Sequence, residues 1–193
     1  MAFVPFESVD RSTLRWLRTG ETPMEFELRS GTSLVARLRW NGPTGSLATA
    51  ESAVGTWTLK RGGFLNPHVT VRGAAGPTPL ARLAVHLSYH RIELAAGPAY
   101  RFHRAGVLVP AWKITTDDRR EILHIEPVRE GRRLSAGAAV APAGAQALPE
   151  LLLLAVLSWY FIVLAWFEDE ALVPFEGPEA PGGPAAPTTT PRP

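Results

Sequence analysis

Hydrophobic and polar residues alternate along the chain from residue 14 to residue 141. In LVARLRW, at 34–40, nearly every second residue is apolar, and Arg37 and Arg39 lie between apolar neighbours. A period of two is typical of a strand with one buried face and one solvated face. The pattern recurs without a helical period and predicts about 12 short strands in this region.

Turn residues separate the alternating runs. Gly62 and Gly63 follow the run WTLKR, and Val69 and Val71 mark a returning strand, which predicts a hairpin. The polar stretch TTDDRR at 115–120 predicts another turn between two strands. Short strands at near-regular spacing favour a mainly β fold with a closed or sandwiched antiparallel sheet.

One stretch breaks this pattern: residues 151–167 read LLLLAVLSWYFIVLAWF, with Ser158 as the only clearly polar side chain. Pro149 and Glu150 suit the first turn of a helix, so we expect a helix over residues 148–170. A helix that is apolar on every side lies in a protein core or in a bilayer. The residues we expect to define it are Leu151, Leu154, Trp159, Phe161 and Leu164.

Both environments stay open for this helix. A membrane span needs roughly 20 apolar residues, with about 17 as the lower limit. The uninterrupted apolar run at 151–167 and the arginines at 129, 132 and 133 favour a single-pass transmembrane helix with a cytoplasmic β domain. Trp159 and Tyr160 fall in mid-span, where an interfacial residue gains nothing, and a closed sheet needs a filler about 10 Å wide. We therefore predict a closed antiparallel barrel of about 12 strands around one C-terminal hydrophobic helix.

Composition fits one globular domain, which we place at residues 12–171, after a lead at 1–11. The remaining residues, 172–193, are rich in Pro, Gly, Ala and Thr and predict a disordered tail. The net charge is +2, and most of the bases are dispersed arginines, so no nucleic-acid partner is expected. The N-terminus lacks the pattern of a secretory signal, which predicts a cytoplasmic location.

Candidate catalytic and metal-binding groups are few. His86 and His90 are four residues apart, but on a strand they stand roughly 13 Å apart on the polar face, too far for a shared metal. Asp117 and Asp118 suit a turn better than acid-base catalysis. The chain has no cysteine, Walker loop, nucleophile elbow or dinucleotide fingerprint. We therefore expect no enzymatic activity, no metal and no cofactor.

The runs WTLKRGGF and YRFHRAGVLVPAWKITTDD, with the order of many strands and then an apolar helix, resemble the tubby C-terminal-like superfamily. This superfamily includes tubby-type, LURP-one-related and phospholipid scramblase-like proteins, and the resemblance covers residues 12–167. It implies a barrel of about 12 strands that encloses a C-terminal hydrophobic helix. It also implies a non-enzymatic binding or scaffolding module, with anionic lipid headgroups or a protein as partner.

The chain departs from the superfamily at residues 134–147, which read LSAGAAVAPAGAQA and contain no acid. Scramblase-like members carry an acidic calcium-binding segment there, so calcium-dependent scrambling is not expected. Lys60 and Arg61 lie in a hairpin suited to anionic-lipid contact. The expectation is therefore a cytoplasmic, membrane-associated module, and the alternative is a single-pass protein anchored by residues 151–167.

Overall fold

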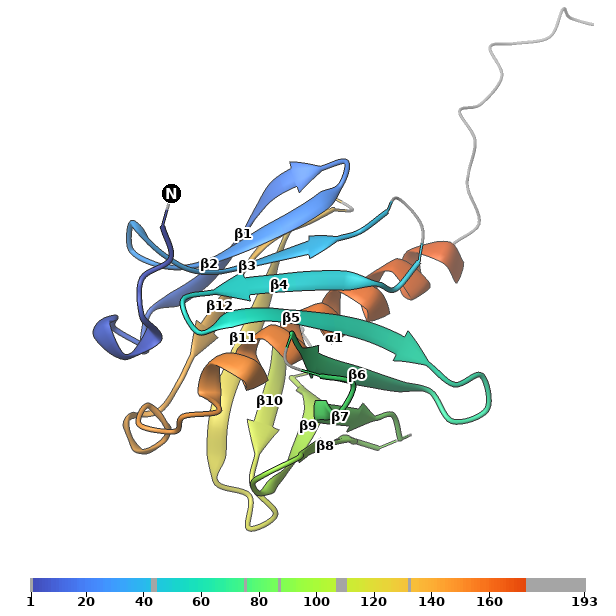
Figure 1. The fold of residues 1–193 in the computed structure, drawn as a ribbon. Coiled ribbons are helices and arrows are strands. Elements are labelled where there is room, and N and C mark those ends of the chain that lie inside the picture. Colours follow the sequence, from blue (N-terminus) through green and yellow to red (C-terminus); the bar gives the residue numbers. More distant parts are fainter. Residues whose placement is uncertain are drawn as a thin grey trace, which may run out of the picture.

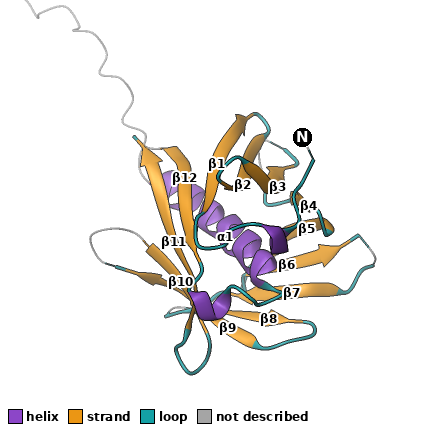
Figure 2. Ribbon diagram, turned by 90° about the vertical axis from the view of Figure 1, so that its left-hand side faces the viewer, coloured by secondary structure: helices purple, strands orange, loops and turns teal. Residues whose placement is uncertain are grey.

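The fold is known from a computed structural model that describes residues 2–42, 45–74, 76–86, 88–106, 111–131 and 133–172, with side chains up to Phe167. Within these residues, twelve strands form one closed barrel around one α-helix (Figures 1 and 2). The strands are β1 (Leu14–Glu21), β2 (Met24–Ser30), β3 (Ser33–Trp40), β4 (Ala48–Ser52), β5 (Gly55–Gly62), β6 (His68–Gly73), β7 (Pro79–Ala84), β8 (His90–Leu94), β9 (Ala99–Ala105), β10 (Ala111–Thr115), β11 (Glu121–Glu130) and β12 (Arg133–Val140).

Every strand pairs antiparallel with its neighbours in sequence, and β1 pairs with β12 to close the barrel. Leu14 lies opposite Ala139 and Leu17 opposite Ala136 across this closing pair. The predicted closed antiparallel barrel is confirmed. Closure removes the exposed strand edges that would otherwise pair with other chains.

Alternation along each strand decides which side chains enter the barrel. In β5, Trp57 and Leu59 are buried while Thr56, Thr58 and Lys60 are exposed. Successive strand residues point to opposite faces, so the inner face of the sheet is almost wholly apolar. This lining requires an apolar partner, because the inner face of a closed sheet otherwise bounds an empty lumen.

The helix α1 (Leu151–Leu172) lies in the lumen, surrounded by the strands (Figure 2). Leu151, Leu154 and Trp159 are fully buried, and Phe161 and Leu164 are half-buried against the core. These contacts place the helix in the core position that the upstream strands favour. None of the helices among the described residues qualifies as a candidate membrane span.

The helix begins three residues later and ends two residues later than the sequence pattern predicts. The predicted tail lies outside the described residues, except for Leu172, which belongs to the helix. Pro149 and Glu150 form a turn, in which the Leu151 N–H donates to the Leu148 carbonyl at 3.2 Å. Pro149 disfavours helical geometry at Leu148, the residue before it. The Tyr100 hydroxyl donates a hydrogen bond to the Glu150 carboxylate and holds this start of the helix against β9.

Aromatic rings fix the helix within the barrel. The ring of Trp159 stacks on Trp16 of β1, with centroids 5.6 Å apart and planes 4° from parallel. Tyr160 stacks on Trp40 of β3 at 5.5 Å, and its hydroxyl donates to the Ser46 carbonyl. Offset stacking of this kind stabilises aromatic pairs beyond the burial of their area. Two successive helix residues are thereby matched to two different strands.

Gly137 of β12 lies directly against the Trp159 ring. A Cβ at this position would be 2.4 Å from a ring carbon of Trp159. Contacts this short do not occur between side chains, so glycine is what allows the indole to lie flat between β1 and β12.

The N-terminal lead packs on the barrel. The Val4 N–H donates to the Leu34 carbonyl at 2.8 Å, and the Phe6 side chain is buried in the core. The Arg11 guanidinium donates to the carbonyls of Phe6 and Gln146. The lead therefore covers the barrel end at which the helix begins.

We call the opposite end of the barrel the exit end (Figure 1). It contains the β1–β2 loop (residues 22–23), the β5–β6 loop (residues 63–67) and the last turns of α1.

We predict that Leu154→Arg unfolds the domain. The substitution places an unpaired charge among buried apolar side chains, at a cost of about 4–5 kcal/mol or more, comparable to the whole stability of a domain. Circular dichroism and urea denaturation check this outcome. Val54→Arg is the matched control, because Val54 is 62% exposed and should accept the charge. A folded Leu154→Arg protein with unchanged stability contradicts the lumen position of α1.

We also expect Gly137→Ala to lower the free energy of unfolding by about 1–3 kcal/mol, because the new methyl group displaces the Trp159 ring from its stack. Thermal unfolding followed by tryptophan fluorescence measures the change. Gly144→Ala is the control, since a Cβ there meets no atom within 4 Å. Equal stability of the two variants would show that the glycine is not required for the ring packing.

Candidate functional site

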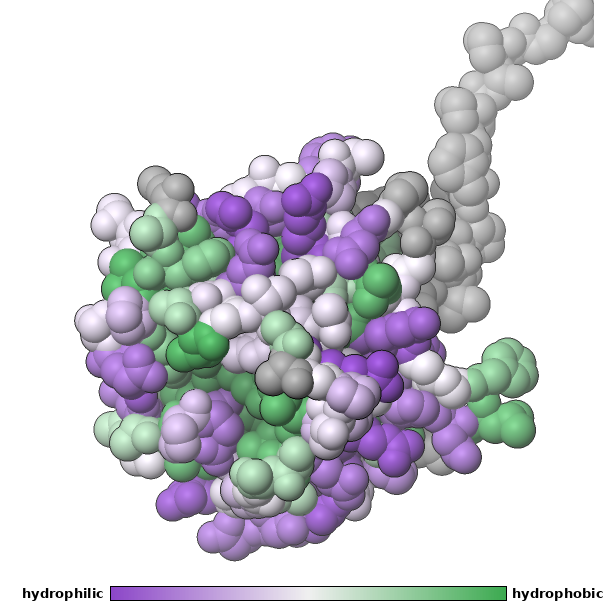
Figure 3. Space-filling model, in the orientation of Figure 1, coloured by the Kyte–Doolittle hydropathy of each residue, from purple (hydrophilic) through white to green (hydrophobic). Residues whose placement is uncertain are grey.

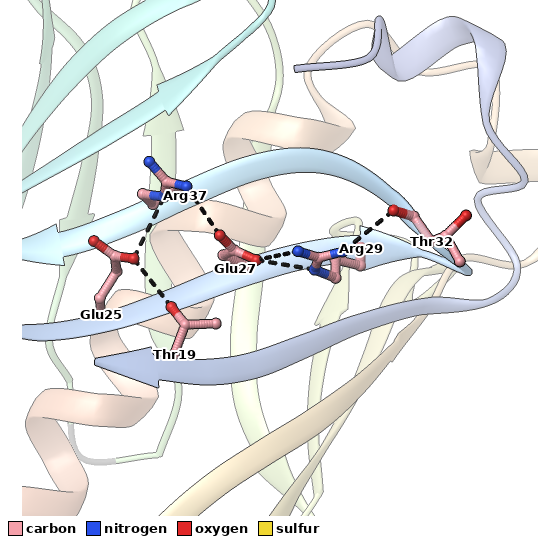
Figure 4. A network of polar contacts seen from close by, with 6 residues as sticks. All are labelled: Thr19, Glu25, Glu27, Arg29, Thr32 and Arg37. Atoms are coloured by element: carbon pink, nitrogen blue, oxygen red, sulfur yellow. Dashed lines mark hydrogen bonds and ion pairs between the residues drawn. The ribbon is translucent and has the colours of Figure 1, made fainter. Parts of the chain in front are cut away.

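An ionic network covers the outer face of β2 and β3 (Figure 4). Glu27 is 5% exposed although it points away from the barrel core. Its carboxylate accepts from Arg29 Nη2 at 2.6 Å and from Arg37 Nη2 at 3.0 Å. Arg37 also lies 3.4 Å from Glu25, which accepts from the Thr19 hydroxyl at 3.0 Å. The network ties three adjacent strands together.

Burial alone raises the pKa of Glu27, but the hydrogen bonds and charges of Arg29 and Arg37 outweigh it and hold the pKa below its ordinary value. Both carboxylate oxygens are occupied by guanidinium groups. Phe3 of the lead lies over Arg37, with the guanidinium carbon 6.0 Å from the ring centroid. An ionised carboxylate that is paired in this way serves as a structural link and is a poor general base.

A groove of about 590 Å³ runs beside the network over β2, β3 and β4. Two arginines and two acids line it: Arg37, Arg39, Glu25 and Glu51. Arg37 is already paired with the acids of the network. The charges of the groove balance, so it offers no strong field for a charged ligand.

His90 lies in a ring cluster on the inner side of β8, near the exit end. Its ring centroid is 4.5 Å from that of Phe161 of α1, 5.9 Å from Phe102 and 6.1 Å from Trp112. Burial, helped by the charge of His86, lowers the pKa of His90 to about 4. Its Nδ1 is buried without a hydrogen-bond partner among the described residues. The imidazole is therefore neutral near pH 7 and packs as an aromatic ring.

The structure corrects the placement of the histidine pair. β7 ends at Ala84 and β8 begins at His90, so His86 lies in the loop between them and not on the same strand as His90. The prediction that both stand on one polar face is wrong, because the chain turns between them. Among the described residues, no group of three or more histidines or acids could hold a metal ion.

The outer face of β5, β6 and β7 is basic. Lys60, Arg72 and Arg82 are exposed on it, and we call these three residues the basic face. Thr70 of β6 pairs with Lys60 on one side and with Arg82 on the other, which places the two bases roughly 10 Å apart across three strands. Arg72 pairs with Thr58, which is two residues before Lys60 on β5. Hydroxyl groups thus lie between cationic groups, a combination suited to phosphate oxygens.

The three strands that carry the basic face contain no acid. Between Glu51 and Glu93 the chain has no aspartate or glutamate, and its bases are Lys60, Arg61, Arg72, Arg82 and Arg91. Glu93, on β8, lies opposite Arg82 in the strand pairing and forms an ion pair with Arg91 at 3.2 Å, so it marks one border of the basic face. No carboxylate from β5, β6 or β7 neutralises the three bases.

Lys60 and Arg61, the two residues that the sequence nominates for anionic-lipid contact, lie on opposite faces of β5. Lys60 is exposed on the outer face, whereas Arg61 is half-buried and follows the inward-facing Leu59. The Arg61 carbonyl accepts a hydrogen bond from the Ser46 hydroxyl at 3.2 Å. The structure therefore groups Lys60 with Arg72 and Arg82 and separates it from Arg61.

The sequence reasoning missed Arg72 and Arg82 as members of this surface. The signal was present in the run without acids from 52 to 92. What brings the bases together is the register of three antiparallel strands, which depends on bulges such as the shift between Val71 and Arg72.

We predict that His90 makes the stability of the domain depend on pH. Its pKa is about 4 in the folded state and ordinary when unfolded, so its contribution is complete above about pH 6.5 and is lost as the pH falls towards 4. Between about pH 7.5 and pH 5 the wild type should lose about 1–2 kcal/mol more than His90→Phe. Urea denaturation at both pH values measures this difference. Identical losses would show that His90 does not carry the effect.

Comparison with known proteins adds no relative to this description. The chain matches no family model, no curated protein and no solved structure.

Proposed function

We propose that this chain is a non-enzymatic binding module that docks on anionic membrane surfaces through its basic face. The barrel enclosing a C-terminal hydrophobic helix has the architecture that the resemblance to tubby-like and scramblase-like proteins implies. Lipid-associated members of that superfamily make a membrane surface a reasonable partner. The proposed location is the cytoplasmic leaflet, where anionic lipids attract basic protein surfaces.

The observation that carries the proposal is the absence of acids from the strands that hold the basic face. Each base close to an anionic surface contributes about 1 kcal/mol to binding, so Lys60, Arg72 and Arg82 together supply about 3 kcal/mol. This corresponds to a preference for anionic over neutral membranes on the order of 100-fold. Acids interspersed on the same face would cancel this attraction.

The state of the titratable groups supports a binding role over catalysis. The Glu27 carboxylate is engaged by two guanidinium groups, and the His90 ring is neutral and packed among aromatic side chains. Asp118 accepts a hydrogen bond from Thr116 in the β10–β11 turn, as its place in a turn sequence suggests. Each of these groups serves the fold, and none is left poised beside a second group for proton transfer.

Flotation with phosphatidylserine-containing vesicles tests the proposal. Replacing the basic face in Lys60→Gln/Arg72→Gln/Arg82→Gln should reduce binding on the order of 100-fold, because it removes three charges that face the lipid. Binding of the wild type should weaken as salt is raised, since mobile ions screen exposed charges.

The matched control is Arg15→Gln/Arg119→Gln/Arg120→Gln, which removes the same charge from exposed residues elsewhere on the barrel. Arg15 is on β1, which lies across the barrel from β6, and Arg119 and Arg120 lie between β10 and β11. The control should bind the vesicles nearly as well as the wild type. A wild-type protein that binds anionic and neutral vesicles equally, or neither, overturns the proposed function.

A further inference from the structure

The tip of the β5–β6 hairpin, residues 63–67, exposes two large apolar side chains in succession. Phe64 is 99% exposed and Leu65 is 87% exposed. The tip projects from the body of the protein as an apolar knob at the right edge of Figure 3. Exposed apolar groups that project in this way mark contact sites for membranes or other proteins.

The conformation of the tip is specified by its sequence. Gly63 has a φ of +77°, and a Cβ there would be 2.2 Å from the Asn66 carbonyl oxygen. His68 Nδ1 lies 2.9 Å from the same oxygen and donates to it. Gly62 pairs with His68 below the turn. Glycine is needed for this turn, and the turn directs the next two side chains away from the barrel.

Basic groups stand directly behind the apolar tip. Lys60 is on the strand that leads into it, roughly 13 Å before Phe64 by the rise of an extended strand, and Arg82 lies level with Lys60 across Thr70. Arg72 lies two residues farther from the tip. When an apolar side chain lies about 5–10 Å into the boundary between headgroups and acyl chains, bases that stand roughly 13 Å behind it lie at the depth of the lipid phosphates. The order of the groups along the hairpin, apolar first and basic second, matches the layers of an anionic bilayer.

A second exposed apolar group at the exit end fits this role less well. Phe167 of α1 is 42% exposed, but Glu168, Asp169 and Glu170 follow it in the sequence. Acids close to Phe167 oppose approach to an anionic surface. The hairpin tip combines strongly exposed apolar side chains with two strands, β5 and β6, that carry bases and no acid.

We propose that the β5–β6 tip is a membrane-insertion element, in which Phe64 and Leu65 enter an anionic bilayer while the basic face holds the lipid headgroups. This inference rests on the proposed function and adds a hydrophobic component to it. It assigns depth and orientation: the β5–β6 hairpin points into the lipid, and the basic face lies against the headgroups. Anionic lipid is chosen over a protein partner because of the bases that flank the tip.

Flotation of Phe64→Ser/Leu65→Ser on phosphatidylserine-containing vesicles tests the inference. We expect a loss of binding on the order of tenfold for each side chain, because each loses its apolar transfer from water. Thermal stability should not change, since neither side chain packs on the barrel. Val54→Ser, on an exposed residue between β4 and β5 at the opposite end, is the control and should bind like the wild type.

A fluorescent probe gives a second readout. The chain has no cysteine, so Leu65→Cys and Val54→Cys each create a single labelling site for an environment-sensitive dye. We expect a blue shift at residue 65 when anionic vesicles are added and none at residue 54. No shift at residue 65 in a protein that binds the vesicles overturns insertion.

The two proposals fail in different ways. If the tip variant keeps full vesicle binding while the basic-face variant loses it, the insertion proposal is wrong and the basic face alone binds lipid. If the wild type binds no anionic vesicle, both proposals fall. If it forms a dimer that Phe64→Ser/Leu65→Ser dissociates, with vesicle binding unchanged, the tip is a self-association surface and insertion is again overturned.

Discussion

The burial of an apolar helix by the inner faces of twelve strands is the interaction on which this structure depends. Neither partner is stable alone in water, because the strands would enclose an empty lumen and the helix would expose apolar side chains on every side. Each fully buried leucine contributes roughly 1.5–3 kcal/mol, and the aromatic stacks of Trp159 and Tyr160 add orientation to that burial. Barrel and helix therefore form one cooperative unit.

Confining the apolar contacts to the lumen leaves the outer surface free to carry charge. On β2 and β3 that charge is paired, as in the contacts of Glu27 with Arg29 and Arg37. On β5, β6 and β7 it is of one sign. Paired charges hold neighbouring strands in register, whereas charges of one sign attract an external partner. The same scaffold thus separates a structural face from a candidate binding face.

Much of the fold could be predicted from the sequence, because alternation, turn residues and one wholly apolar segment are local signals. The barrel and the position of α1 followed from them. The placement of His86 and His90 did not, since apolar residues on both sides of a turn can continue an alternating pattern without forming one strand. The basic face could not be assembled either, because it depends on the register of neighbouring strands, such as the pairing of Thr70 with Arg82, and a bulge next to that pair shifts the register. Exposure of Phe64 was equally hidden, since an apolar residue after two glycines could have turned inward.

The pairing of β1 with β12 has a consequence for how the protein is made. The first strand cannot find its last neighbour until more than a hundred intervening residues have been synthesised, from Leu17 to Ala136. The core helix follows still later, beginning at Leu151. On the ribosome, the strands are therefore synthesised before the helix that covers their apolar faces. Such non-local folding is slow, and unfinished barrels of this kind expose sticky surfaces that chaperones would need to shield until translation ends.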